Sequence, residues 1–355
     1  MAEAVARDSA NSLRRILVTG ISGNLGGRLA PLLTGYEVIS VDLYPPREGT
    51  PAGKFYQADL STPAGQQRLT QILESEQVDA VLHLAFVIDQ VQTGIVAQDR
   101  MWQANVGAPQ SLLEAIAARN KLARNVKLFV FLSSVSAYGP DLLERVREDA
   151  PLAAHTLPYA IHKRETDLLC QKMFAELGGC AVYIFRPHIY AGASVDNYIL
   201  RAIRGQASGR GWLARLFQRR GWKLPALLPR SGEGGELQFV HVDDVARVLL
   251  WTLHNFHPEA LEIFNLAGGG PPIRFGECAR LAGTPIRRAR SIAQIRVILK
   301  IIWALGLSGI PAESIPYYLT SYTMDTANLE QALGADYASV VKFTTHSALL
   351  DAIQK

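Results

Sequence analysis

Three side chains have types and a spacing that could move a proton to and from a substrate oxygen: Ser134, Tyr159 and Lys163. Tyr159 and Lys163 are four residues apart at the start of an expected helix, so their side chains lie on one face of it. A free phenol has a pKa of about 10 and is a poor base near neutral pH, but a nearby ammonium favours the phenolate. Tyr159 can then exchange a proton with a carbinol or carbonyl oxygen, to which Ser134 also hydrogen-bonds. The three residues therefore predict acid–base chemistry at an alcohol or a ketone.

A glycine-rich turn at residues 19–26, Thr-Gly-Ile-Ser-Gly-Asn-Leu-Gly, closes one expected strand and opens a helix. Gly20 permits the tight turn, Gly23 lets backbone N–H groups approach a pyrophosphate, and Gly26 allows the helix to pack closely on the strand. The start of that helix presents unpaired N–H donors to phosphates. A strand before the motif and a helix after it are the context that a dinucleotide-binding turn requires. We expect six residues of the turn to bind the cofactor: Gly20, Ser22, Gly23, Asn24, Leu25 and Gly26.

Two carboxylates, at the ends of the second and third expected strands, are candidates for contacts with the adenosine part of a dinucleotide. Asp42 ends the second expected strand, where it can accept hydrogen bonds from the adenosine ribose hydroxyls and would repel a 2′-phosphate. NAD(H) is therefore favoured as the cofactor, while NADP(H) stays open because Arg47 lies nearby. Asp59 and Leu60 follow the third expected strand and are expected at the adenine, although Asp59 could instead be only the N-cap of the next helix.

The elements that must position these residues alternate between short apolar runs and helical stretches. Strands are expected at 15–19, 36–42, 78–84, 126–133 and 181–185, and helices from the glycine turn to 33, over 98–120 and over 156–177. Such alternation is typical of βαβ units with right-handed crossovers and a parallel sheet. We therefore expect an α/β fold, a Rossmann-type doubly wound parallel sheet with a smaller C-terminal substrate lobe.

The chain is expected to divide into a tail, a main domain and a lobe. Residues 1–13 are expected to form a flexible tail, and 14–190 the NAD-binding domain, to which 236–266 return. Residues 191–355 are expected to form mostly the substrate-binding lobe. A length of 355 residues allows a large core without disulfides.

Composition excludes several classes of protein. A hydrophobic fraction of 48% with 19% charged residues excludes a disordered chain, and a net charge of +4 gives no support for nucleic acid as a partner. Cys170, Cys180 and Cys278 form no C-x-x-C pair and no histidines have metal-ligand spacing, so neither a disulfide framework nor a metal site is expected. The first residues lack the apolar stretch of a secretory signal, and we expect a cytoplasmic protein.

The motifs together resemble the extended short-chain dehydrogenase/reductase superfamily, in particular its NAD-dependent epimerase/dehydratase group. The resemblance spans residues 14–268 and is carried by 19–26, His83-Leu-Ala85, 133–139, Tyr159-x-x-x-Lys163, Arg186-Pro187 and 239–246. It implies that Ser134 and Tyr159 are catalytic and that Lys163 also holds the nicotinamide ribose. We also expect cofactor contacts at Leu84, Ala85, Asn105 and Pro187, and substrate contacts at Phe86, Ser136 and His188.

Departures from the family pattern narrow the expected chemistry. Nucleotide-sugar 4,6-dehydratases of the family carry an Asp-Glu pair directly after the catalytic residue, where this chain has Val135 and Ser136. Family epimerases usually carry an Asn and an Arg at the positions of Ile189 and Leu237, and both of those groups would hold a nucleotide diphosphate. The Arg186-Pro187 form looks more like the reductase and hydroxysteroid-dehydrogenase branch.

The preferred hypothesis is an NAD(H)-dependent oxidoreductase that interconverts a secondary alcohol and a ketone by hydride transfer. The first alternative is an NAD-dependent epimerase of a sugar or related hydroxylated substrate, with tightly held NAD. The second is a non-catalytic protein that senses the dinucleotide, against which the joint presence of Ser134, Tyr159 and Lys163 argues. A small molecule is the expected partner, and a homodimer is an expectation of the resemblance alone.

Two segments of the expected lobe have more than one interpretation. Residues 201–230 contain eight Arg or Lys, three aromatic residues and no Asp or Glu. They favour either a channel for an anionic group of the substrate or a solvated insertion. Residues 292–307 are strongly apolar apart from Arg296 and Lys300 and are too short to span a membrane. They form either an amphipathic helix at a membrane surface or over a lipid-like substrate, or a core or dimer-interface helix.

Overall fold

The computed structural model describes residues 13–88, 97–122, 126–140, 142, 145–209, 211–308, 317 and 321–354. The tail expected at residues 1–13 lies outside this part of the chain apart from Leu13, as does Arg210 of the basic segment. The chain forms two compact units. Unit 1 comprises Met1–Ala137, Pro158–Arg186 and Val245–Phe264, and unit 2 comprises Tyr138–Leu157, Pro187–Asp244 and Asn265–Lys355.

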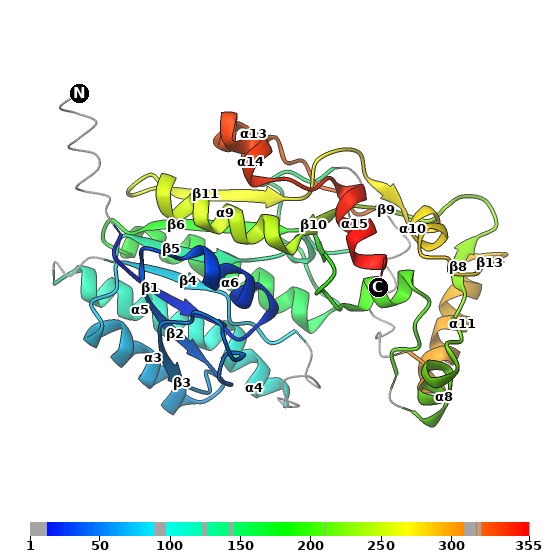
Figure 1. The fold of residues 1–355 in the computed structure, drawn as a ribbon, viewed down its shortest axis with the longest axis horizontal. Coiled ribbons are helices and arrows are strands. Elements are labelled where there is room, and N and C mark those ends of the chain that lie inside the picture. Colours follow the sequence, from blue (N-terminus) through cyan, green and yellow to red (C-terminus); the bar gives the residue numbers. More distant parts are fainter. Residues whose placement is uncertain are drawn as a thin grey trace. The chain divides into compact units, whose positions relative to one another are not determined.

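A seven-stranded sheet in the order β11-β6-β5-β4-β1-β2-β3 forms the centre of the first unit (Figure 1). The strands are β1 Arg15–Thr19, β2 Glu37–Asp42, β3 Lys54–Gln57, β4 Ala80–His83, β5 Leu128–Leu132, β6 Ala181–Pro187 and β11 Leu261–Leu266. Each pairing from β6 across to β3 is parallel. The strand order reverses at β1, between β2 and β4, and ligands of such sheets bind at the carboxyl ends beside this point. The predicted Rossmann-type doubly wound parallel sheet is therefore confirmed.

The central strands are rich in apolar residues, as is usual for parallel strands that are covered on both faces. β4, β5 and β6 are buried at every position, whereas no residue of the edge strand β3 is fully buried. The main core joins the sheet to α3 Pro63–Ser75 and α5 Ala108–Asn120. Leu69, Leu112 and Phe129 are among its fully buried members. This core fixes the carboxyl ends of the strands, where the candidate site residues lie.

The helix expected over 98–120 is interrupted by a π-helical turn. α4 Gln98–Trp102 is followed by the π turn η2 Gln103–Gly107 and then by α5. Pro109, in the first turn of α5, has no N–H to donate to the carbonyl of Asn105 four residues earlier. The hydroxyl of Thr166 donates to that carbonyl instead, at 2.8 Å. Pro109 therefore explains why a π turn interrupts the continuous α-helix that we expected.

Two helices bear site residues: one follows the glycine turn, and the other comes after β5. They are α2 Asn24–Leu29 and α6 Pro158–Met173, and each is followed by a 3-10 turn, η1 Ala30–Leu32 and η4 Phe174–Glu176 respectively. α6 packs against α5 and against the π turn η2. This packing places the start of α6 beside the segment that follows β4.

The second unit consists of short strand pairs and helices. β7 Ile189–Ala191 pairs with β10 Phe239–His241 and β8 Ala226–Pro229 with β13 Ile286–Ala289, both in parallel, whereas β9 Glu236–Leu237 and β12 Ile273–Arg274 are antiparallel. The longer helices are α8 Trp212–Arg220, α11 Ile292–Ala304 and α15 Thr345–Ile353, and the shorter ones are α7 Tyr198–Ile203, α10 Phe275–Leu281, α13 Ala327–Leu333 and α14 Tyr337–Val340. Helix α9 Val242–Asn255 begins at the end of a unit 2 segment and continues in unit 1. Within the described part of the chain no helix is long and apolar enough to cross a membrane.

Candidate active site

The structure brings Ser134, Tyr159 and Lys163 together at the carboxyl edge of the sheet. Ser134 lies just beyond the end of β5, and Tyr159 and Lys163 lie in the first turns of α6. The Ser134 hydroxyl lies close enough to the Tyr159 phenol to lower the pKa of that phenol. Lys163 Nζ donates to the carbonyl of Leu132, the last residue of β5, at 2.6 Å. The ammonium thus ties the start of α6 to the end of the strand that carries Ser134.

Two further side chains that were expected at the substrate lie against this group. Ser136 donates to Ser134 Oγ through its hydroxyl at 2.9 Å and through its backbone N–H at 3.1 Å. The centre of the Phe86 ring lies 3.5 Å from Lys163 Nζ, a cation–π contact. The rings of Phe86 and Tyr159 meet edge to face with centroids 5.6 Å apart. Phe86 therefore contacts both residues of the expected Tyr–Lys pair.

Burial dominates the electrostatics of the group. Removal from water raises the pKa of Tyr159, and the hydrogen bond from Ser134 opposes that shift. Burial also lowers the pKa of Lys163 well below its usual value, and the carboxylate of Asp167 opposes that shift. We expected Lys163 to lower the pKa of Tyr159. In the structure the pKa is raised by burial, and the opposing contribution comes from Ser134.

Asn105 acts as a clamp on the segment that carries Phe86. Its Oδ1 accepts from the Val87 backbone N–H at 2.7 Å, and its Nδ2 donates to the Val87 carbonyl at 3.0 Å. Its Nδ2 also lies 3.2 Å from Nδ1 of His162 on α6. Asn105 is fully buried in the π turn, a feature that is frequent at functional sites. Asn105 thereby holds the segment after β4 next to α6.

The glycine turn has the close backbone packing that its sequence predicts. Gly20 has φ of +80°, and a Cβ there would lie 2.6 Å from the backbone nitrogen of Ala85. A Cβ at Gly26 would collide with the carbonyl oxygen of Gly20. Gly23 is the N-cap of α2, so Asn24 and Leu25 form its first turn. This close packing requires glycine at positions 20 and 26, as in the turn that binds a pyrophosphate in dinucleotide-binding folds.

Asp42 lies at the end of β2 beside the same turn. Its Oδ2 accepts from the backbone N–H of Ser22 at 2.9 Å, and its Oδ1 accepts from the backbone N–H of Leu43 at 2.7 Å. Ser22 Oγ donates to the carbonyl of Tyr44 at 2.6 Å. The carboxylate is therefore held in place at the position where an adenosine ribose was expected.

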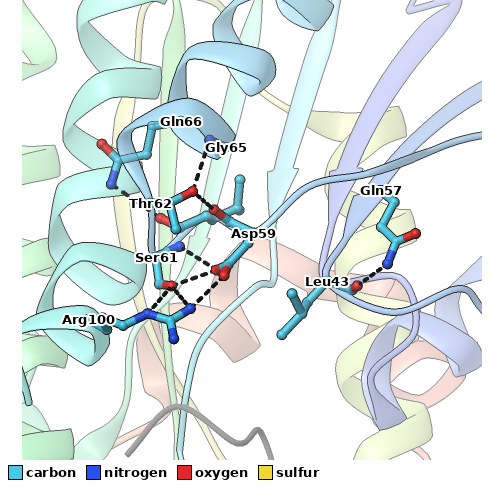
Figure 2. A network of polar contacts seen from close by, with 9 residues as sticks. Leu43, Gln57, Asp59, Ser61, Thr62, Gly65, Gln66 and Arg100 are labelled. Carbon is cyan, nitrogen blue, oxygen red and sulfur yellow. Dashed lines mark hydrogen bonds and ion pairs between the residues drawn. The ribbon is translucent and has the colours of Figure 1, made fainter. Parts of the chain in front are cut away.

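Asp59 belongs to a polar network that also contains Arg100, a residue that the sequence analysis missed (Figure 2). Arg100 Nη2 pairs with Asp59 Oδ2 at 2.6 Å, and Asp59 Oδ1 accepts from the Ser61 backbone N–H at 3.0 Å. The N-cap of α3 is Thr62, whose Oγ1 accepts from Gly65, so the alternative that Asp59 is an N-cap is wrong. Leu60 is buried in the main core, which leaves its backbone for any adenine contact.

The remaining expected contacts lie along β4 and at the start of the second unit. Leu84 and Ala85 follow β4 and donate to the carbonyl and to Oγ1 of Thr19, at 3.1 and 3.2 Å. Pro187 is the last residue of β6. His188 is buried, with Nε2 2.6 Å from the carbonyl of Tyr322 and Nδ1 accepting from the Ile189 N–H at 2.8 Å. Both ring nitrogens of His188 are thus bonded within its own unit, and burial lowers its pKa to about 4.

A buried ion pair behind the site was also missed from the sequence. Asp167 lies one helical turn after Lys163 on α6, and both of its oxygens pair with Arg186 of β6, at 2.9 and 3.0 Å. Both side chains are almost completely buried. The spacing of Tyr159, Lys163 and Asp167 along one helix face was a signal for it, but the partner on β6 could be found only from the fold.

His83 supports the sheet under Lys163 and gives the stability of the protein a pH dependence. It lies between Phe129 and Phe131, and its Nδ1 is 2.9 Å from Thr19 Oγ1. Burial, and next the charge of Lys163, lowers the pKa of His83 to about 3.

We expect acid to destabilise the protein through His83. As pH falls below 6.5, His83 becomes protonated in the unfolded chain, whereas in the folded protein it stays neutral until about pH 3. Stability from this group is thus full above that window and falls by about 1.4 kcal/mol per pH unit within it. Urea unfolding across the window should show a shallower pH dependence for His83→Gln. Identical slopes for the two proteins would contradict this prediction.

Other ligand chemistry has little support in the described residues. No group of three His, Cys, Asp or Glu side chains there could hold a metal ion. Cys170, Cys180 and Cys278 are buried free thiols, and burial raises the pKa of each.

A doubly wound parallel sheet with a glycine turn after its first strand defines a Rossmann-type dinucleotide-binding protein. The model of the NAD dependent epimerase/dehydratase family matches residues 16–267, and the chain belongs to this family. The resemblance stated from the motifs is thus confirmed, and so are NAD as the cofactor of the family and membership in a family of extended short-chain dehydrogenase type.

Curated relatives and solved structures agree with this membership. The chain is 31% identical over 193 residues to a UDP-glucose 4-epimerase of Lactobacillus helveticus, covering 52% of this chain and 54% of that protein. It is 27% identical to an uncharacterised epimerase/dehydratase of Staphylococcus saprophyticus, covering 47% of this chain and 50% of that protein. The matches span about half the length of these relatives. The Thermus thermophilus UDP-glucose 4-epimerase complex with NAD has a similar fold, with a TM-score of 0.65, 19% identity, and 96% and 97% of the two chains covered.

Proposed function

We propose that the protein is an NAD(H)-dependent oxidoreductase that interconverts a secondary alcohol and a ketone. The observation that supports this most directly is that the three groups gather at one sheet edge. Ser134 lies close enough to the Tyr159 phenol to lower its pKa, and Nζ of the buried Lys163 lies 5.9 Å from the centre of the Tyr159 ring. A hydroxyl and a phenol that lie side by side can together hold one substrate oxygen. The phenol can then give that oxygen a proton or take one from it.

The roles in this mechanism follow from the positions of the side chains. NAD, when bound, supplies or accepts the hydride. Tyr159 transfers the proton, Ser134 orients the substrate oxygen, and Lys163 holds the nicotinamide ribose and favours the phenolate by its charge. The glycine turn fits the pyrophosphate, because its backbone is bare where Gly20 and Gly26 pack. Asp42 would bind the hydroxyls of the adenosine ribose.

The same residues argue against two other activities of the family. Val135 and Ser136 stand where a 4,6-dehydratase would need two acids, and neither side chain is a proton donor of that strength. Ile189 and Leu237, in place of the groups that would hold a nucleotide diphosphate, are both buried apolar residues of the second unit. We therefore propose a substrate without a nucleotide diphosphate.

An epimerase is the second candidate, since two of the curated relatives are UDP-glucose 4-epimerases. Another relative, 33% identical over 142 residues, is a dTDP-6-deoxy-L-talose 4-dehydrogenase of Kitasatospora kifunensis, which supports the dehydrogenase reaction equally. A homodimer, a cytoplasmic location and the division at residue 190 stay predictions.

Nicotinamide absorbance during turnover separates the two candidates. The oxidoreductase should consume NADH in equal amount with a ketone, tested on a panel of ketones and alcohols. The epimerase should convert its substrate with no added cofactor and no net change in absorbance, and the purified protein should carry NAD. Substrate turnover that leaves NADH untouched would refute the oxidoreductase.

Asp42 is expected to set the preference for NADH over NADPH. Replacing Asp42 by Asn removes the charge that repels a 2′-phosphate and weakens the bonds to the ribose hydroxyls. Hydrogen bonds to a charged group contribute about 1.5–3 kcal/mol, so the ratio of the two dissociation constants should change by about tenfold or more. Cofactor titrations of both variants check this, with Asp59→Asn as the control that should affect NADH and NADPH alike. An unchanged ratio in Asp42→Asn would show that this residue does not contact the ribose.

A further inference from the structure

Two helices of the second unit, α8 and α11, carry large apolar side chains on their exposed faces. We call the exposed residues of these helices, and of the turns directly after them, the α8–α11 surface. Its apolar members include Trp212, Trp222, Ile292, Val297, Ile301 and Trp303. The two helices are joined by a small core that includes Ala214 and Leu307, with Phe217 and Ile302 packed against it. They therefore form one body beside the β8–β13 pair (Figure 1).

The apolar exposure of this surface is unusual for a helix that faces water. α11 has 13 residues, of which only Ile295 is buried. Trp212 is 71% exposed, Val297 is 56% exposed and Trp303 is 54% exposed. A surface helix normally presents polar side chains to solvent, and a contiguous exposed apolar patch indicates an interaction site. The α8–α11 surface is therefore expected to be covered by a partner.

The charge of the surface is of one sign. Residues 212–222 contain three Arg, residues 292–307 contain Arg296 and Lys300, and neither range has an Asp or Glu. On α11, Arg296 and Lys300 alternate with Val297 and Ile301 along the exposed side. On α8, the basic members of the surface are Arg215, Arg219 and Arg220, and all are exposed. Among the described residues, none of these five cations pairs with a carboxylate.

We propose that the α8–α11 surface binds the surface of an anionic lipid membrane. Basic side chains interleaved with aliphatic and Trp side chains are the chemistry of helices that lie in the membrane interface. Trp rings favour the headgroup region because they have an apolar body and a polar N–H, and this surface carries three of the five Trp of the chain. α11 is too short to span a bilayer, so it would lie along the interface.

Other occupants fit the surface less well. A second copy of the chain in a symmetric dimer would place the same patch against itself and bring its uncompensated cations together. A purely acidic protein would satisfy Arg296 and Lys300 but leave the exposed Ile and Trp side chains uncovered. An anionic bilayer satisfies both, because phosphate groups lie directly above an apolar layer. The proposal does not depend on the reaction that the first unit carries out.

Vesicle binding by the full chain tests the proposal. We expect co-sedimentation with phosphatidylcholine vesicles that contain phosphatidylserine, and much weaker binding to vesicles of phosphatidylcholine alone. Added salt should weaken the binding, since the cations act through a screened surface potential. Tryptophan fluorescence should shift to shorter wavelength on binding, because Trp212, Trp222 and Trp303 would leave water.

Paired variants assign the binding to this surface. Arg296→Glu with Lys300→Glu should weaken binding at least about 25-fold, because each basic residue near an anionic surface contributes about a factor of five. Ile301→Ser with Trp303→Ser should weaken it at least about tenfold through lost apolar burial. The matched controls are Lys121→Glu with Lys172→Glu and Leu122→Ser with Leu168→Ser, which change exposed residues of the first unit. These controls should bind as the unchanged protein does.

The outcomes are distinguishable from one another. Salt-sensitive binding to the acidic vesicles that only the α11 variants lose would support the proposal. An absence of vesicle binding, with a dimer that the α11 variants dissociate in light scattering, would overturn it in favour of contact between copies. Vesicle binding that the control variants lose equally would also overturn it. Circular dichroism and NADH binding report whether each variant is folded.

Discussion

Replacement of Tyr159 by phenylalanine is expected to lower kcat about 10²- to 10⁴-fold while leaving the binding of NADH nearly unchanged. The substitution removes one oxygen and keeps the ring, so the edge-to-face contact with Phe86 persists. The variant loses the phenol of Tyr159. Of the Ser–Tyr pair, only this phenol has a pKa that the charge of Lys163 can bring into a range useful for proton transfer. Steady-state kinetics with the best ketone of the panel, together with an NADH titration, measure the two quantities separately.

Two further variants show whether the loss is chemical. Tyr36→Phe is the matched control, because Tyr36 is a half-buried tyrosine of the same unit that stacks on His254 outside the site. Its kcat should equal that of the unchanged protein. Ser134→Ala should lower kcat through poorer orientation of the substrate oxygen, with the phenol still present. A Tyr159→Phe protein that keeps full activity would remove the phenol from the mechanism and favour the cofactor-sensing alternative.

The effect of burial on the pKa of Tyr159 predicts how activity depends on pH in each direction of the reaction. Desolvation raises the pKa of this phenol, and its bond to Ser134 lowers it. A phenol with a raised pKa is a proton donor rather than a base at neutral pH, which suits the reduction of a ketone. Activity in the oxidation direction should therefore rise with pH as the phenol ionises, and activity in the reduction direction should fall over the same range.

The parts of the fold that the sequence predicts are those that depend on neighbours along the chain. Fully apolar runs predict the central strands, because a strand covered on both faces has no polar side. The glycine turn predicts part of its own packing, since a Cβ at Gly26 would collide with the backbone of Gly20 and Ile21. The collision at Gly20, by contrast, is with Leu84 and Ala85, which only the sheet brings close. The group of Ser134, Tyr159 and Lys163 is predicted because a strand end and a helix start meet at one sheet edge.

The parts that the sequence did not predict depend on pairs that only the fold brings together. Asp59 and Arg100 are 41 residues apart, and nothing near Asp59 indicates a guanidinium partner. Phe86 was expected at the substrate, but its contact with Lys163 depends on how Asn105 holds the segment after β4. The π turn, by contrast, is indicated by the sequence itself. Pro109 lacks the N–H that a regular helix needs, although the residues around it have a helical pattern.

Replacement of Asp167 by alanine is expected to cost about 3–5 kcal/mol of unfolding free energy, because it removes a buried carboxylate that pairs with the buried guanidinium of Arg186. Arg186 makes two bonds to this carboxylate, and Gln171 donates a third at 2.7 Å. Urea unfolding measures the loss. The matched control is Glu37→Ala, which breaks ion pairs with Arg14 and Arg15 near the surface of the same unit and should cost much less.

The double replacement of Asp167 by Leu and Arg186 by Met separates the charge from the packing. It should recover part of the lost stability, since neither partner of the buried ion pair is then left without the other. A single Asp167→Ala protein as stable as the unchanged one would show that the pair contributes nothing.

The double variant also tests the electrostatic link to the site. The carboxylate of Asp167 raises the pKa of Lys163, so without it the ammonium should lose its proton at lower pH. If that ammonium supports catalysis, the alkaline limb of the pH profile of kcat should move to lower pH in this folded protein. An unchanged profile would mean that Asp167 stabilises the fold without affecting the charge of Lys163.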